Sequence, residues 1–323
     1  RGRATQHAKL WLLHWGAVGD DDSESLEIVI SSANLTRAAF AGQIQGAWRT
    51  CLPLDRPSKR IARKRLSGWG ILPAFLRELA ESSATSDHAA YFIDLLSRTD
   101  CPGGVSFVGS VPGTHPPKSL RHTPWGTAGL KQEAPSGRGS VKTSILSPYV
   151  GSWNTVSLRS WCTAFGGSPD RLELVWIDAG HPWKTYWSLP ETSLYDMLDV
   201  GATLVDLGNG GDNSGPGTFH ELHSSDDARW SHAKVYAFRR GRSSQLLITS
   251  ANFSPSAWGR TVPDGSITID NFELGVCVKQ GEWPFEGLPQ LKADKAVIIQ
   301  AEKDSSPRLI SWGQAWWDGV RIV

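Results

Sequence analysis

Two segments near opposite ends of the chain carry matching sets of polar residues that could cleave a phosphodiester. Each contains the tripeptide His-Ala-Lys, followed after an intervening stretch by the tripeptide Ser-Ala-Asn. One imidazole could attack phosphorus while the other protonates the leaving oxygen, and the ammonium and carboxamide groups could bind the nonbridging oxygens. The residues on which this hypothesis rests are His7, Lys9, Asn34, His232, Lys234 and Asn252.

The spacing within each tripeptide has a geometric meaning if the tripeptide lies on a strand. Side chains at positions i and i+2 of a β-strand point to the same face, so each His would lie beside the Lys that follows it. A single His-x-Lys pattern is weak evidence, because it occurs by chance. Two copies that both lead to Ser-Ala-Asn are strong evidence for an internal repeat.

The residues around each motif predict the same order of elements in both copies. Apolar, partly alternating runs predict strands at residues 8–13, 27–31, 233–239 and 245–249. A short helix is expected after each Asn, at residues 35–43 and 254–259. Such a repeat implies two homologous domains that face one another with pseudo-twofold symmetry.

The stretch between the two copies supplies further elements and a connection. Helical periodicity is seen at residues 71–81 and 86–97, and residues 105–108 are typical of a strand. Residues 112–139 are rich in Pro, Gly, Ser and Thr, which favours an interdomain connection.

We therefore expect an α/β fold with two similar domains, each a mixed β-sheet flanked by helices. The predicted boundaries are residues 1–125 for the first domain and 126–323 for the second. Because the first motif begins so near Arg1, the first domain is expected to be incomplete at its N-terminus.

Composition narrows the class of protein but not its partner. The 323 residues carry a net charge of +1 and a hydrophobic fraction of 40%, which fits a soluble globular protein in which any DNA affinity comes from a local patch. No apolar run is long enough for a membrane helix. The four cysteines lack zinc-ligand spacing and predict neither a metal site nor disulfides, so a reducing compartment is expected.

The paired motif resembles the phospholipase D superfamily, whose full pattern is HxKxxxxD. The Asp is replaced here by His14 in the first copy and by Arg239 in the second. Loss of the Asp with retention of His, Lys and Asn resembles the tyrosyl-DNA phosphodiesterase family. That family's motif blocks are similar to residues 7–10, 32–35, 45–48, 109–113, 232–234, 249–252, 257–259 and 272–276.

The resemblance implies a role for each motif residue. His7 would be the nucleophile that forms a phosphohistidine, and His232 would protonate the leaving phenolate and later activate water. Gln45 and Glu273 would orient the two imidazoles. The remaining residues would bind the phosphoryl oxygens, namely Lys9, Lys234, Asn34 and Asn252. No metal and no cofactor are expected.

DNA contacts are also implied by the resemblance. An aromatic residue common in the family four positions before the first His is Arg3 here, and a guanidinium plane can stack on a base. The serines expected to contact the DNA backbone are Ser110, Ser147, Ser152 and Ser254. A basic run at residues 56–65 could follow a phosphate backbone, serve as a nuclear import signal, or be a solvated helix face.

The function that the resemblance implies is hydrolysis of DNA 3'-phosphotyrosyl bonds and related 3' adducts in DNA repair. The expected partners are single-stranded or frayed DNA 3' ends that carry a topoisomerase-derived peptide, with no membrane. A monomer in the nucleus is expected. Two alternatives stay open: another phosphodiesterase or nuclease of the superfamily, and a catalytically inactive DNA-end binding module.

Overall fold

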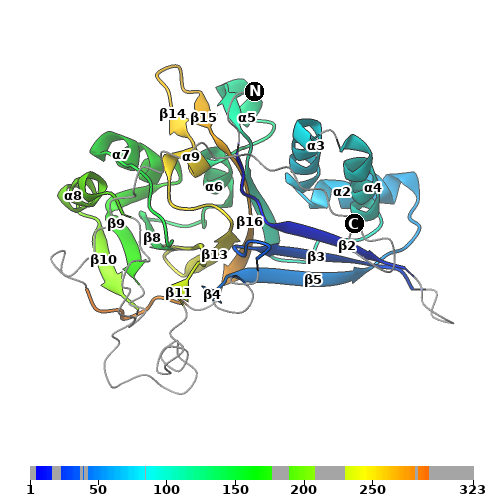
Figure 1. Cartoon of the computed structure of the whole chain (residues 1–323), viewed down its shortest axis with the longest axis horizontal. Helices are drawn as coiled ribbons and strands as arrows, with labels where there is room; N and C mark the ends of the chain where they lie inside the picture. Colours follow the sequence, from blue (N-terminus) through cyan, green and yellow to red (C-terminus); the bar gives the residue numbers. More distant parts are fainter. Residues whose placement is uncertain are drawn as a thin grey trace.

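The structure is a computed structural model that describes residues 5–16, 23–36, 39, 43–83, 85–176, 189–207, 230–280 and 283–290. It has the predicted α/β composition, with several β-sheets and flanking helices (Figure 1). Of the elements predicted around the motifs, the helix after Asn34 falls largely outside the described residues.

The largest sheet contains most strands of the second half of the chain and two from the first. Its order is β1-β16-β13-β12-β8-β9-β10, and β6 also pairs with β16. The bounds are β1 Thr5–Gln6, β6 Val105–Ser110, β8 Val141–Leu146, β9 Gly167–Trp176, β10 Thr203–Asp206, β12 Val235–Arg240, β13 Ser243–Thr249 and β16 Asn271–Gln280. Both parallel and antiparallel pairs occur, so the sheet is mixed as expected.

A second sheet of three antiparallel strands lies next to the first motif, with Lys9 just before its first strand and Ser32 just after its second. It comprises β2 (Leu10–Trp15), β3 (Ser25–Ser31) and β5 (Ala47–Pro53) in that order. Its alternation sets the buried face, because Leu26, Ile28 and Ile30 are all fully buried. Helices α2 (Lys59–Gly68), α3 (Leu72–Ser83) and α4 (Ser86–Ser97) lie together on one side of this sheet (Figure 1).

Smaller elements tie the two halves of the chain together. Strand β4 (Gln43–Ile44) pairs with β11 (Trp230–Ser231) across the halves. A further sheet has the order β14-β15-β7, with bounds Arg260–Thr261, Ile267–Ile269 and Gly113–His115. Because β1, β4, β6 and β7 all pair with strands of the second half, the predicted domains at residues 1–125 and 126–323 share sheets.

The second half is built around an aromatic core under the large sheet. Trp153 stacks on Phe253 with ring centroids 4.8 Å apart, and Trp161 packs edge-on against Phe253 at 5.0 Å. Helices α7 (Thr155–Ala164) and α8 (Glu191–Asp199) pack residues into the same core. Aromatic rings bury large areas and make directional contacts, so this core fixes the strands that carry the second motif.

The stretch predicted as an interdomain connection, residues 112–139, contains regular elements: β7, α5 (Pro117–Leu120) and α6 (Thr127–Glu133). At least one glycine of this stretch serves tight packing. Gly126 has φ +58°, and a Cβ there would lie 2.3 Å from the Trp258 carbonyl oxygen, beside helix α9 (Pro255–Trp258). Within the described residues, no helix is long and apolar enough to span a membrane.

Candidate active site

The two motifs meet because each is anchored on a strand from the other half of the chain. The His7 amide donates to the Phe272 carbonyl at 3.0 Å, just beyond the parallel pair of β1 and β16. The His232 amide donates in the same way to the Ile44 carbonyl at 2.9 Å, just beyond the parallel pair of β4 and β11. The two histidines are thus anchored in the same way, as the pseudo-twofold symmetry requires.

The serines of the two Ser-Ala-Asn segments repeat this symmetry. The Ser32 hydroxyl donates to Gln45 Oε1 at 2.7 Å and accepts from the Gly46 amide at 3.0 Å. The Ser250 hydroxyl donates to Glu273 Oε2 at 2.5 Å and accepts from the Leu274 amide at 3.2 Å. Gln45 and Glu273 therefore occupy equivalent positions, and the two serines position them.

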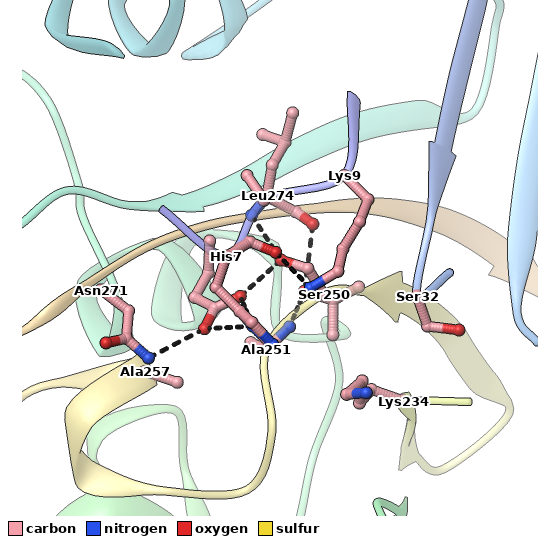
Figure 2. A network of polar contacts seen from close by, with 12 residues as sticks. His7, Lys9, Ser32, Lys234, Ser250, Ala251, Ala257, Asn271 and Leu274 are labelled. Atoms are coloured by element: carbon pink, nitrogen blue, oxygen red, sulfur yellow. Dashed lines mark hydrogen bonds and ion pairs between the residues drawn. The ribbon is translucent and has the colours of Figure 1, made fainter. Parts of the chain in front are cut away.

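Glu273 contacts the imidazole of the other half of the chain directly. Both carboxylate oxygens lie 2.9 Å from His7 Nδ1, and the Glu273 side chain is almost completely buried. Asn271 donates to Glu273 Oε1 at 3.1 Å. Figure 2 shows His7, Ser250 and Asn271 gathered in this one network. With Nδ1 engaged by a carboxylate, the other ring nitrogen of His7 is left to react.

Asn271 and the two serines were not predicted as site residues. The signal that could have identified Asn271 is its position two residues before Glu273 on the same strand, which places both side chains on one face. The signal for the serines is that the repeat preserves the whole Ser-Ala-Asn tripeptide rather than the Asn alone.

The His232 ring contacts the Ser32 carbonyl and the Lys234 side chain. Its Nδ1 lies 3.1 Å from the Ser32 carbonyl oxygen, and both ring nitrogens lie 3.1 Å from Lys234 Nζ. Gln45 is therefore linked to His232 through Ser32. Burial, with repulsion from Lys234, Lys9 and His7 added, lowers the pKa of His232 to about 4. In the free protein at neutral pH this imidazole is neutral.

The two lysines are held in environments that disfavour their charge. Lys9 Nζ donates to the His7 carbonyl at 2.6 Å, and Lys234 Nζ donates to the His232 carbonyl at 2.9 Å. Burial lowers the pKa of Lys9 to about 8, with Glu273 opposing the shift. Burial, with repulsion from Lys9 added, lowers the pKa of Lys234 well below its ordinary value. An anion bound near both ammonium groups would offset the repulsion between them.

The two asparagines differ in their surroundings. Asn34 is exposed and lines a pocket of about 410 Å³ together with His7, Lys9 and Trp11. The Asn252 Oδ1 atom is buried and has no hydrogen-bond partner in the described part of the chain. The Ala251 carbonyl before it accepts from Tyr236 Oη at 3.1 Å, and Trp258 Nε1 donates to the same Oη at 2.9 Å. This buried chain of hydrogen bonds fixes the turn that presents Asn252.

The predicted DNA-contacting serines fall into different surroundings. Ser110 is fully buried on β6, and the Ser147 hydroxyl is buried and bonds the Tyr149 carbonyl and the Phe253 amide. Ser254 caps helix α9 by accepting from the Ala257 amide at 3.2 Å. Only Ser152 of the four is exposed. Arg3 lies outside the described residues.

The predicted basic run forms helix α2 and its N-terminal flank. Five of its cations are exposed, whereas Arg65 pairs with Asp55 at 2.5 Å and Asp100 at 3.2 Å. Arg65 therefore stabilises the fold, and the exposed members are Arg56, Lys59, Arg60, Arg63 and Lys64.

Among the residues that the structure describes, no group of three or more His, Cys, Asp or Glu side chains is arranged to hold an ion. The cysteines are all free.

Fold and site together define a phosphodiesterase with a phospholipase D-like fold. The chain belongs to the tyrosyl-DNA phosphodiesterase family, whose profile matches residues 3–147 and 213–310. It is similar in fold to the crystal structure of the yeast tyrosyl-DNA phosphodiesterase, with a TM-score of 0.54 at 14% identity over 90% of this chain and 70% of that one. A histidine-to-arginine variant of the yeast enzyme gives a TM-score of 0.55 at 14% identity, over 86% of this chain and 68% of that chain.

Proposed function

We propose that this phosphodiesterase hydrolyses DNA 3'-phosphotyrosyl bonds and related 3' adducts in DNA repair, through a covalent phosphohistidine and without a metal ion. The observation that carries the proposal is the contact between His7 Nδ1 and the Glu273 carboxylate at 2.9 Å. This contact orients the His7 ring, and it supports a role for the other ring nitrogen as the nucleophile beside Lys9 and Lys234.

In the first step, the free ring nitrogen of His7 attacks phosphorus and the P–O bond to the tyrosine breaks. The phenolate takes a proton from His232, while Lys9 and Lys234 stabilise the charge on the nonbridging oxygens. In the second step, His232 accepts a proton from water as the water oxygen attacks the phosphohistidine. The P–N bond breaks, His7 is regenerated, and the DNA leaves with a 3'-phosphate.

Protonation of His232 depends on the substrate. A pKa of about 4 in the free protein leaves this imidazole neutral at pH 7. A phosphodiester anion bound between the lysines offsets their positive field, which raises the pKa of His232 and favours the acid form needed in the first step.

The substrate that we propose is a single-stranded or frayed DNA 3' end with a topoisomerase-derived peptide attached. The family membership supports this choice. We propose further that the protein acts as a monomer in the nucleus, where exposed cations on α2 could serve as an import signal. Size-exclusion chromatography with light scattering tests the monomeric state. Microscopy of a fluorescent fusion with and without these charges tests the nuclear location.

The test of activity uses an oligonucleotide with a 3'-phosphotyrosine, incubated with the protein in excess EDTA. The expected product is a 3'-phosphate, formed by the wild type and absent with His7→Ala. A folded preparation that binds the oligonucleotide without converting it would favour the inactive end-binding alternative. Internal cleavage of unmodified DNA would instead favour a nuclease.

A further inference from the structure

A cationic pocket lies at the far end of the strands that carry the second motif. It has a volume of about 380 Å³ and is lined by Arg138, Gly139, Ser140, Lys142, Arg171, Arg239 and Gly241. Lys234 lies just before β12 and Arg239 near its end, so the pocket is roughly 17 Å from the active site at about 3.3 Å per residue. It is therefore separate from the catalytic centre.

The cations come from different elements that the sheet brings together. Arg239 on β12 lies opposite Lys142 on β8 in the antiparallel register, and Arg171 projects from the neighbouring strand β9. Arg138 and Gly139 belong to the loop that precedes β8, whereas Gly241 belongs to the turn after β12. Several separate segments thus contribute to one positively charged hollow.

Neighbouring groups hold two of these cations in place. Lys142 pairs with Glu173 at 2.7 Å and Arg239 with Glu286 at 2.7 Å. Both lie over the Trp283 ring, with Arg239 Cζ 4.9 Å and Lys142 Nζ 5.8 Å from its centroid. A cation over an indole face is attracted by the ring, so these two side chains are oriented before any ligand binds.

Among the residues that the structure describes, the other two cations have no such partner. Arg138 and Arg171 are exposed, and no carboxylate of the described residues lies within 4.0 Å of either. The loop that carries Arg138 packs against Arg240, because a Cβ on the adjacent Gly137 would lie 3.3 Å from the Arg240 carbonyl oxygen. Arg240 in turn donates to the Phe165 and Gly166 carbonyls at 3.2 and 3.4 Å. The pocket therefore carries excess positive charge in a chain whose net charge is only +1.

We propose that this pocket binds phosphate groups of a nucleic-acid backbone, as a second contact site remote from the scissile bond. Guanidinium groups bind phosphate oxygens in a bidentate manner, and glycine backbones allow close approach. The cations are spread along the ends of several strands, which suits successive phosphates of a strand. The choice of a nucleic acid as the ligand rests on the proposed function. A free phosphate ion presents the same oxyanion to the pocket.

The test measures, by fluorescence anisotropy, how tightly the wild type and two double variants bind a 20-nucleotide single-stranded DNA without any 3' adduct. The variant Arg138→Gln/Arg171→Gln removes the unpaired cations, and Arg77→Gln/Lys131→Gln is a control that removes two exposed charges elsewhere. We expect the pocket variant to bind about tenfold more weakly at low salt. The slope of log affinity against log salt should become shallower by about 1.4, at about 0.7 per phosphate contact.

Equal affinities and slopes for the two double variants would overturn the proposal. It would also be overturned if inorganic phosphate raised the thermal midpoint of the wild type but not of the pocket variant while DNA affinity stayed unchanged. That result would identify a small-anion site.

A dinucleotide with a 3'-phosphotyrosine is too short to reach the pocket, so both variants should turn it over like the wild type. Unequal turnover by the pocket variant alone would contradict a remote site. Absence of turnover by the wild type would defeat the proposed function, while the binding comparison would still decide the pocket.

Discussion

Glu273 and His7 lie 266 positions apart in the chain, yet the Glu273 carboxylate contacts His7 Nδ1 with both oxygens at 2.9 Å. The contact exists because β1 pairs in parallel with the start of β16, so that the first motif is held on a strand of the second half. The imidazole and the carboxylate of this pair therefore come from opposite halves of the chain.

Glu273→Gln should impair turnover while the fold persists. His7, Ser250 and Asn271 all lie within hydrogen-bond distance of the Glu273 carboxylate. An amide offers only one acceptor oxygen in place of two, so it cannot accept from all three. We expect kcat to fall by up to about 10⁴-fold with little change in KM, the loss seen when a catalytic imidazole exchanges its carboxylate partner for an amide. Glu81→Gln is the matched control at an exposed carboxylate on α3, away from the site and from the cationic pocket. Equal kcat values for the two variants in steady-state kinetics would refute the positioning role.

Anion binding should be coupled to proton uptake by His232. The pKa of this imidazole is lowered from 6.5 to about 4 in the free protein, so between these values it is neutral when the site is empty. A bound anion raises that pKa, and affinity for sulfate should strengthen as pH falls from 6.5 towards 4, by up to about tenfold per pH unit where one proton is taken up. Isothermal titration in buffers of different ionisation enthalpy measures the uptake. An unchanged pH slope in His232→Asn would assign the proton elsewhere.

Lys234→Met should stabilise the fold and abolish activity. The ammonium is fully buried and its pKa is well below the ordinary value, so the folded state disfavours its charge. Replacing it with an apolar side chain of similar length should raise the free energy of unfolding by about 1–3 kcal/mol at pH 7. Urea denaturation measures the difference. Lys131→Met, at an exposed helical position, should change it by less than about 0.5 kcal/mol. A destabilised Lys234→Met protein would show that the lysine contributes to the fold.

Tyr236→Phe should weaken the support of the turn that presents Asn252. Loss of the hydroxyl leaves the Ala251 carbonyl and Trp258 Nε1 without this partner in a buried region. The free energy of unfolding should fall by about 1–3 kcal/mol, because a buried polar group without a hydrogen-bond partner has lost its contacts with water and gained nothing in return. Tyr195→Phe removes an exposed hydroxyl and should cost almost nothing. Equal costs for the two variants in chemical denaturation would contradict the proposed support.

Sequence alone predicted several strands and helices because their patterns are local. The strands expected at residues 8–13 and 233–239 begin two residues later, as β2 and β12, so both His-Ala-Lys tripeptides lie just before a strand. The strand at residues 27–31 and the helix at 86–97 appear as β3 and α4, since alternating or helical periodicity dictates which face is buried. The His-Lys-Asn set was found because it occurs twice. These are signals that a single pass along the chain can detect.

Other features depend on contacts between residues far apart in the chain. Pairing of β6 with β16 is invisible in either segment, and so is the tight approach of Gly126 to Trp258 that turns an apparent connection into packed structure. The Ser147 hydroxyl resembles any loop serine until its bonds to Tyr149 and Phe253 are known. Only the three-dimensional arrangement separates such structural hydroxyls from those that could face DNA.

The central claim is that His7 is the nucleophile and His232 the acid and base. It is tested most directly by incubating His232→Asn with a labelled 3'-phosphotyrosyl oligonucleotide in EDTA, then mapping any protein–DNA adduct by mass spectrometry. Without a base to activate water, the intermediate should accumulate as DNA joined through phosphorus to His7. An adduct at another residue, or product formation by His7→Ala at the wild-type rate, would contradict the account.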